Sequence, residues 1–339
     1  MYIIRPAKYE DLDELVELAQ IMAPGITTFP PDNEVIKHKV HQSISAFSDT
    51  HQSSEPGSFL LVLEDTLNNR VVGTAGVYSQ IGHSQPFYSF KLVSQTQLSE
   101  QAQLKCTSTT LHLTNAFQGG TEVGTLLLHP DYNGKGLGKF LSKSRYMLIR
   151  AFEDLFNEPA FAELRGWTDE SGRSPFWEAL GRHFFDQMDF DKADLLSATT
   201  NNQFIADMMP RYPIYLDILP DDAKAVIGKA NPKGEGALQM LFKEGFRDEG
   251  YIDIFDAGAT VVARFEDIHT FKNAKKLTLV MSDEIPNEEK LCFLATTEIT
   301  NFRMINLTQY IVDGDNLIIN KSATTQGFEE GQEVLFYPC

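Results

Sequence analysis

The alternation of apolar and polar residues near the start of the chain predicts a strand, a helix and a hairpin. Residues 2–5 are expected to form a short strand, and the apolar positions of residues 12–19 recur at helical spacing. Further on, two apolar, β-branched runs, Phe59–Glu64 and Arg70–Tyr78, flank the polar segment Asp65–Asn69. Such a segment has the composition of a turn between strands, so we expect a β-hairpin here.

Strands also dominate the pattern in the centre of the chain. The threonine-rich run Leu104–Leu113 predicts a strand, because β-branched residues favour that conformation. Gln118–Gly120 interrupts the pattern before the next strand, Thr121–His129. A further apolar run predicts a strand at Phe161–Arg165.

The second half of the chain begins with a helix signal. A serine followed by a proline at residues 174–175 is typical of a helix start, with serine as the cap and proline at the first helical position. A strand–helix–strand set is expected next, with strands at Ala225–Lys229 and Tyr251–Phe255. The helix between them is predicted at Ala237–Lys243, and Gly245 closes it.

The last part of the chain predicts a small β-rich unit. From residue 275 onward, short alternating runs are separated by polar turns, one of which is Asp313–Asp315. The strands expected there are Leu277–Met281, Leu291–Thr296, Asn316–Ile319 and Glu333–Tyr337.

Composition then narrows the classes of partner. The net charge is −18, from 29 basic and 47 acidic residues, which argues against a nucleic-acid or anionic-membrane binder. The three cysteines are scattered, which fits neither a disulfide framework nor a thiolate metal site. Because no long apolar run is present either, we expect a cytoplasmic protein that binds neither nucleic acid nor membrane.

A glycine-rich loop between the strand Thr121–His129 and a predicted helix carries the clearest chemical signal. Glycines at alternate positions let the backbone turn tightly and leave successive N–H groups uncovered. Together with the helix N-terminus, such a loop suits an anionic diphosphate. The spacing matches neither a P-loop nor a dinucleotide fold. The loop comprises Asn133, Gly134, Lys135, Gly136, Leu137, Gly138 and Lys139.

This loop resembles the pyrophosphate loop of the GNAT acyl-CoA N-acyltransferase superfamily, [Arg/Gln]-x-x-Gly-x-[Gly/Ala]. Both glycines match, while Asn133 occupies the first position. The resemblance implies that the loop binds the cofactor's pyrophosphate. It also implies that the backbone of Leu126, Leu127 and Leu128, in the preceding strand, hydrogen-bonds the pantetheine arm. The leucine side chains themselves are typical of a core.

Sequence blocks outside the loop carry a second and more specific resemblance. They are Phe59–Asp65, Pro86–Phe90, Thr125–Leu128, Leu141–Arg145, Leu164–Gly166, Ser174–Phe185, Phe204–Ala206, Pro213–Tyr215, Val226–Gly228 and Gly250–Asp256. In these blocks the chain resembles the arginine N-succinyltransferase family.

That resemblance implies an enzyme of arginine catabolism that transfers succinyl from succinyl-CoA to the α-amino group of arginine. Succinyl-CoA would be the co-substrate, no metal would be needed, and the protein would form a homodimer or hetero-oligomer. Two alternatives stay open. One is a different acyl-CoA or amine acceptor, such as ornithine or a polyamine, and the second is a catalytically weak partner subunit of a hetero-oligomer.

The weak-subunit alternative rests on one departure from the family. The family has a His-Pro pair whose histidine is assigned as proton donor, and Asn231 occupies that position here. An asparagine side chain exchanges no proton near neutral pH, although it can form hydrogen bonds. His183 is the nearest candidate for a substitute acid or base, and His129 is a second. Either histidine is also typical of a structural role.

Recognition of the acceptor arginine calls for carboxylates and a cation. Glu163, Glu178, Asp253 and Asp256 are candidates for a bidentate contact with the guanidinium group. Arg165 is a candidate partner for a substrate carboxylate. Each of these side chains is equally typical of a solvated or structurally paired group.

The sequence thus predicts an α/β fold of the GNAT type, with a mixed sheet, flanking helices and an elaboration. Residues 1–200 are expected to form the acyl-CoA-binding domain. Residues 201–270 are expected to be a family-specific extension on the acceptor side, and residues 271–339 to be the β-rich unit.

Overall fold

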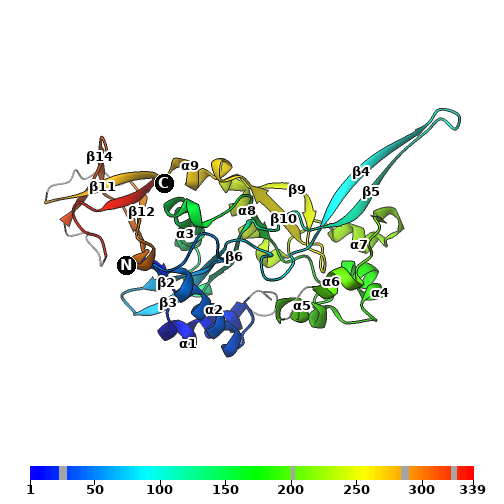
Figure 1. The fold of residues 1–339 in the computed structure, drawn as a ribbon, viewed down its shortest axis with the longest axis horizontal. Coiled ribbons are helices and arrows are strands. Elements are labelled where there is room, and N and C mark those ends of the chain that lie inside the picture. The colour runs from blue at the N-terminus through cyan, green and yellow to red at the C-terminus, as the bar shows by residue number, and fades with distance from the viewer. Residues whose placement is uncertain (23–28, 200–202, 284–289, 322–326) are drawn as a thin grey trace. The chain divides into compact units, whose positions relative to one another are not determined.

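The computed structural model describes residues 1–22, 29–199, 203–283, 290–321 and 327–339 (Figure 1). Its contacts divide the chain into two units, each assembled from separate segments. Unit 1 comprises residues 1–80, 121–158 and 264–339, and unit 2 comprises residues 81–120 and 159–263. Unit 1 therefore receives its strands from both ends and the middle of the chain.

Unit 1 is built on a mixed sheet with the strand order β14-β15-β11-β16-β12-β13-β1-β2-β3-β6. The β11–β15 pair is parallel, and the neighbouring pairs are antiparallel. The strands are β1 (Tyr2–Pro6), β2 (Ser58–Asp65), β3 (Arg70–Tyr78), β6 (Thr121–Leu128), β11 (Lys275–Ser282), β12 (Cys292–Thr296), β13 (Met304–Leu307), β14 (Ile311–Asp313), β15 (Asn316–Asn320) and β16 (Glu333–Pro338).

The helices of unit 1 pack on this sheet through apolar faces. Leu15 of α1 and Ile36 of α2 are fully buried and share one core cluster with Leu60 and Leu127 of the sheet. Asp32 caps the start of α2, because its side chain accepts a hydrogen bond from the backbone N–H of residue 35 at 3.0 Å. The helices are α1 (Leu12–Met22), α2 (Asn33–Ala46), α3 (Leu137–Ala151) and α9 (His269–Asn273).

The C-terminal strands join the N-terminal strand in the same sheet. Ile3 of β1 pairs with Ile305 of β13, and both side chains belong to one buried cluster with Leu294 and Phe336. The β-rich character expected after residue 275 is confirmed, and positive φ at Gly314 forms the expected turn between β14 and β15. Whether residues 271–339 fold on their own, with boundaries at 200 and 270, stays a prediction.

Unit 2 combines a second run of strands with short helices. Its strand order is β7-β10-β9-β4-β5-β8, and these pairs are antiparallel. The strands are β4 (Ser89–Ser99), β5 (Leu104–Thr114), β7 (Ala160–Glu163), β8 (Ile214–Tyr215), β9 (Arg247–Ile252) and β10 (Ala259–Ala263). The helices are α4 (Arg182–Phe184), α5 (Phe190–Thr199), α6 (Gln203–Met208), α7 (Asp221–Val226) and α8 (Glu235–Glu244).

Aromatic side chains form the core of unit 2. Trp177 is fully buried in a π-helical turn, Trp177–Gly181, that runs directly into α4. Its indole N–H donates to the carbonyl of Met188 at 2.9 Å, which satisfies the polar atom of an otherwise apolar ring. Ser174 caps the helix start, as expected, by accepting from the N–H of Trp177 at 3.2 Å.

The β4–β5 hairpin extends as a long two-stranded arm (Figure 1). Strand β9 pairs with it only at Phe90 and Lys91, and β8 only at Thr110 and Leu111. Near the turn of the arm, Leu98 is 74% exposed. The remainder of the arm is thus a ribbon held by its own hydrogen bonds.

Several expected elements need correction. The strand predicted at Ala225–Lys229 is wrong, because Asp221–Val226 forms α7. Two acidic residues in its first turn favour a helix, and positive φ at Gly228 turns the chain soon after it ends. The strands predicted at Phe161–Arg165 and Tyr251–Phe255 are shorter, since β7 ends at Glu163 and β9 at Ile252.

Candidate active site

The glycine-rich loop has the backbone that the sequence predicts. Gly134 and Gly136 have φ of 79° and 77°, a region that L-residues with side chains rarely adopt. No heavy atom of the described residues lies within 4 Å of the position where a Cβ would stand on either glycine. Glycine is therefore required here by conformation, and the space beside the loop is open.

The start of α3 presents an uncompensated positive end. Gly136 is the N-cap residue, and within the described chain no side chain caps the helix there. The first turn contains no acidic residue, while Lys135 and Lys139 are exposed beside it. Free N–H groups, the helix dipole and two lysines together favour a bound anion.

Aromatic contacts hold the loop against the sheet. The Lys135 ammonium lies 4.9 Å from the centre of the Tyr132 ring. The Tyr132 hydroxyl donates to Asp65, at the end of β2, over 3.3 Å. Burial and this carboxylate raise the pKa of Tyr132, so the phenol stays protonated as a donor.

Strand β6 leads into the loop and is interrupted by a β-bulge. Leu128 pairs with Gly73 and Leu127 with Thr74, after which the register shifts. Two residues, Thr125 and Leu126, then lie opposite a single residue of β3. Thr125 has φ of 50°, which is unusual for a β-branched residue. Of the three leucines, Leu127 is buried, and the remaining two are partly exposed.

A carboxylate that the sequence reasoning missed lies on the far side of this bulge. Glu122 pairs with Tyr78 of β3, and its side chain is partly buried. Burial raises its pKa to about 7, although the Lys39 ammonium nearby lowers it. The sequence could have singled out this residue, because Glu122 is the one charged residue in the strand predicted at Thr121–His129.

Unit 2 contains a buried ionic cluster centred on Arg165. Its guanidinium group lies 2.6 Å from Asp194 and 3.3 Å from Asp256, and 4.6 Å from the centre of the Phe190 ring. Asp256, 1% exposed, also accepts from the N–H groups of Gly166 and Gly258, each at 2.9 Å. These carboxylates raise the pKa of Arg165 despite its burial. Nothing in the sequence pattern distinguished Asp194 from other aspartates as a partner of Arg165.

Asp253 sits beside this cluster and is held by the backbone. It accepts from the N–H groups of Phe255 and Asp256 at 2.7 and 2.8 Å. Burial and the neighbouring Asp256 and Asp194 carboxylates raise the pKa of Asp253 well above its ordinary value. The structure thus brings Arg165, Asp253 and Asp256 together in one cluster, in which Asp256 pairs with Arg165 and Asp253 is held by backbone N–H groups.

Asn231 borders the same cluster through the backbone. Its N–H donates to the carbonyl of Arg165 at 2.7 Å, and the adjacent residues Gly166 and Ala230 form a β-bridge. Its side-chain oxygen accepts from the N–H of Lys233 at 3.1 Å, which caps a short helical turn. The side chain therefore has a structural task at the position where the family has its histidine.

The remaining candidate side chains are dispersed over both units. Glu163 accepts from Thr260 at 3.2 Å, and Glu178 forms an ion pair with Arg182 at 2.6 Å. His183 is exposed on α4. In unit 1, the ring nitrogen of His129 accepts from the N–H of Asp131 at 3.3 Å, so this histidine caps the turn before the loop.

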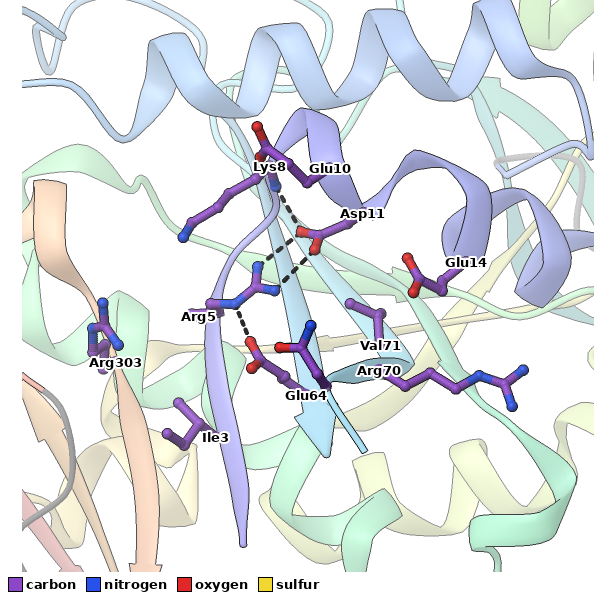
Figure 2. A pocket seen from close by; sticks show the side chains of 11 residues that line it. Ile3, Arg5, Lys8, Glu10, Asp11, Glu14, Glu64, Arg70, Val71 and Arg303 are labelled. Carbon is purple, nitrogen blue, oxygen red and sulfur yellow. Dashed lines mark hydrogen bonds and ion pairs between the residues drawn. The ribbon is translucent and has the colours of Figure 1, made fainter. Parts of the chain in front are cut away.

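A pocket in unit 1 is lined by side chains of both charges, and its central ion pairs connect elements of the fold (Figure 2). It encloses about 360 Å³ and contains no residue of the glycine-rich loop. Arg5 points toward Asp11 and Glu64, to which it lies within 2.8 and 2.5 Å, and both contacts are drawn in Figure 2. Because four basic and four acidic residues line it, this pocket offers little net charge to a ligand.

The described residues contain neither a metal-ligand cluster nor a membrane-spanning helix. Within those ranges, no group of three or more histidine, cysteine, aspartate or glutamate residues is arranged to hold a metal ion. In the same part of the chain, no helix has the length and apolar character to cross a membrane.

Comparison with known proteins identifies the family. The family model described as arginine N-succinyltransferase beta subunit matches residues 2–270. The chain is 35% identical to the arginine N-succinyltransferase of Yersinia pestis (strain Pestoides F) over 340 residues, covering 98% of this chain and 97% of that one. It is 37% identical to that of Enterobacter sp. (strain 638) over 303 residues, covering 89% and 88%. The chain belongs to the arginine N-succinyltransferase family.

A solved structure shares the fold over the full length. The arginine/ornithine succinyltransferase subunit AI from Pseudomonas aeruginosa superposes with a TM-score of 0.87 at 27% identity. The superposition covers 100% of this chain and 98% of that one. The α/β fold with a mixed sheet and flanking helices, expected from the sequence, is confirmed.

The raised pKa of Asp253 predicts a specific pH dependence of stability. A buried acid with a raised pKa binds its proton more tightly when folded, so its ionisation increasingly opposes folding as pH rises above about 4. Asp253→Asn removes this penalty and keeps the oxygen that accepts both N–H groups. We expect its melting temperature, relative to wild type, to be about 2–4 °C higher at pH 8 than at pH 4.5.

Thermal unfolding followed by circular dichroism measures this difference. Asp217→Asn, at an exposed aspartate of unit 2, is the matched control and should show the same offset from wild type at both pH values. A difference for Asp253→Asn that stays constant with pH would contradict the raised pKa.

Proposed function

We propose that this protein transfers the succinyl group of succinyl-CoA to the α-amino group of arginine, a step of arginine catabolism. The relatives that cover nearly the whole chain are named arginine N-succinyltransferase. The observation that carries the proposal is the strand–loop–helix at residues 121–151, which lies inside the family match and whose helix start, without a side-chain cap or an acidic residue, favours a bound anion. Family and local chemistry therefore point to the same class of reaction.

The loop is proposed to hold the cofactor's pyrophosphate. Among the described residues nothing crowds a Cβ built on Gly134 or Gly136, so the backbone there is accessible, and Lys135 and Lys139 supply the local positive charge. The pantetheine arm is then proposed to run along the backbone of Leu126–Leu128.

The acceptor is proposed to bind through acidic side chains of unit 2. Asp256 already pairs with Arg165, and Asp253 lies beside it with a raised pKa, so giving up the Arg165–Asp256 pair to bind substrate would leave a buried charge uncompensated. Glu163 and Glu178 are therefore the guanidinium partners that we favour. A glutamine substitution at the correct residue should raise the KM for arginine and leave the KM for succinyl-CoA unchanged.

A second candidate function is favoured by Asn231. Its side chain caps a turn and exchanges no proton, so the chain could be a weak partner subunit of a hetero-oligomer. Ornithine is a second candidate acceptor, because the solved structural neighbour is titled arginine/ornithine succinyltransferase subunit AI. A polyamine acceptor and a different acyl-CoA donor also stay open, and the activity assay below includes them.

Assembly and location are further parts of the proposal. The matching family model is described as a beta subunit, which supports a homodimer or hetero-oligomer, and light scattering of the purified protein would measure its mass. The free thiols at residues 106, 292 and 339 support a reducing, cytoplasmic location, which cell fractionation would test.

An activity assay tests the main proposal. Purified protein with succinyl-CoA and arginine should release CoA thiol and form one equivalent of a succinylated arginine, detected by mass spectrometry. Acetyl-CoA, ornithine and a polyamine serve as competitors. Faster turnover of a competitor pair would replace the proposed substrates, and no reaction with any pair would support the weak-subunit function.

The loop assignment predicts the effect of Gly136→Val. A β-branched residue at φ of 77° costs about 1–3 kcal/mol and displaces the N–H groups, so CoA affinity should fall tenfold or more. Gly172→Val is the matched control, because Gly172 also has positive φ and open space but lies in unit 2. Calorimetric titration with CoA should show weaker binding for Gly136→Val and unchanged binding for Gly172→Val.

Restoring the family's histidine with Asn231→His separates an active enzyme from a weak subunit. Because Asn231 caps its turn, we expect the substitution to lower turnover or leave it unchanged. A gain of about 100-fold or more would instead show that the site lacks only its proton donor. Steady-state kcat with saturating succinyl-CoA and arginine is the measurement.

A further inference from the structure

The outer half of the β4–β5 arm is exposed to solvent along its length (Figure 1). We define the outer arm as residues 94–109, which lie beyond the last residues that β9 and β8 pair with. Residues 94–107 are all exposed, and the two strands pair in regular register out to Ser99 and Leu104. Because a two-stranded ribbon by itself is at best marginally stable in water, the outer arm suits a surface that a second molecule covers.

The side chains of the outer arm can be covered at little cost. Ten of its 16 residues are serine, threonine or glutamine, and only one is acidic and one basic. The hydroxyls of Ser94 and Thr109 lie 3.1 Å apart across the strands, and those of Thr96 and Thr107 lie 3.0 Å apart. Since these hydroxyls already hydrogen-bond one another, removing water from them leaves no partner lost.

The outer edge of β5, on the side opposite β4, is open to a further strand. Exposed edges are usually protected by prolines, lysines or bulges. The outer arm has no proline, a single lysine and no shift of register. Among the described residues, no strand pairs with this edge from Leu104 to Thr109. These six residues span about 20 Å at about 3.4 Å per residue and present free backbone groups.

An exposed apolar surface begins where this open edge ends. Tyr215 of β8 pairs with Thr110, the next residue of β5. We define the β8 segment as residues 208–218. Its exposed apolar side chains are Met208, Tyr212, Tyr215 and Ile218, of which Tyr212 is 85% exposed. Tyrosine, methionine and arginine, present here as Arg211, are the residue types enriched in protein–protein interfaces.

Charge favours a second copy of this chain as the molecule that covers these surfaces. Two chains of net charge −18 repel one another unless they meet through surfaces without net charge. The outer arm carries one charge of each sign, Glu100 and Lys105, and the β8 segment carries Arg211 and Asp217. Both surfaces are therefore neutral, and each offers an opposite charge to each charge of the other.

Symmetry and size also fit a dimer. Two identical strand edges can pair antiparallel about a two-fold axis, so that both copies use the same surface. With the axis near Cys106 and Thr107, at the middle of the open edge, Leu104 of one copy lies beside Thr110 and Tyr215 of the other. The outer arm and the β8 segment comprise 16 and 11 residues, and a standard interface takes about 20–30 residues from each side.

We propose that two copies of this chain dimerise by antiparallel pairing of their β5 edges, with the tip of each arm seated on the β8 segment of the other copy. The main-chain hydrogen bonds of the new strand pair supply affinity, and the apolar side chains at each end supply register. The proposal rests on the assembly named in the proposed function and is independent of the proposed reaction.

Charge exchange at the axis tests the pairing. Wild type should have twice the chain mass of 38.1 kDa in light scattering. Thr107→Glu and Thr107→Lys each place like charges opposite one another across the axis, so each variant alone should raise the dimer dissociation constant about tenfold or more. An equimolar mixture of the two variants should restore the dimer, a result that misfolded variants would not give. Thr278→Lys, at an exposed strand threonine of unit 1, should keep the wild-type mass.

Crosslinking tests the position of the axis. The exposed Cys106 thiols of the two copies should lie about 10 Å apart or less, given the spacing of paired strands. A short bismaleimide should therefore link wild type into a covalent dimer. Cys106→Ser should abolish the link and leave the mass in light scattering unchanged. A link that persists in Cys106→Ser would run through another thiol, such as the exposed Cys339, and would overturn the proposed geometry.

The same samples separate this proposal from the proposed reaction. A wild type that is monomeric, or a dimer that Thr107→Glu and Thr107→Lys both leave intact, overturns the arm-to-arm pairing. If such a protein still succinylates arginine, the proposed reaction stands and the dimer proposal alone fails. If the dimer responds to both charge variants as expected but acylates no amine, the proposed reaction alone fails.

Discussion

The pairing of β6 with β3 is the interaction on which the position of the glycine-rich loop and of α3 depends. Regular pairing at Leu127 and Leu128 fixes where the strand ends and therefore where the glycine-rich loop and α3 begin. The bulge at Thr125 changes the register, so the residues before and after it do not follow a single alternation. One strand thereby orients the glycine-rich loop at one end and the Glu122 carboxylate toward the opposite end.

Net charge and local charge have opposite signs in this protein. The chain carries −18 overall, yet the start of α3 has no acidic residue and two exposed lysines beside it. Backbone N–H groups contribute fixed positive potential without adding to the net charge. A polyanionic cofactor is therefore compatible with an acidic protein, and the acidic surface also favours the approach of a cationic acceptor.

The buried cluster around Arg165 shows how structure and recognition compete for the same residue types. One guanidinium holds Asp194 and Asp256, and the adjacent Asp253 is driven toward its protonated form. The cluster also positions the Arg165 carbonyl, which accepts a hydrogen bond from the N–H of Asn231. Residues chosen as substrate ligands by type alone can thus be needed to hold neighbouring loops of unit 2 together.

The sequence alone determined the elements with strong local signals. Alternate glycines with a following apolar helix, the serine cap before Trp177 and the hairpin at Asp65–Asn69 depend on neighbours in the chain, so pattern reasoning was sufficient. The tertiary structure alone decided the pairing of Ile3 with Ile305, the partnership of Arg165 with Asp194, and the environment of Glu122. Each of these joins distant segments or depends on desolvation by the surrounding fold, which residue spacing does not encode.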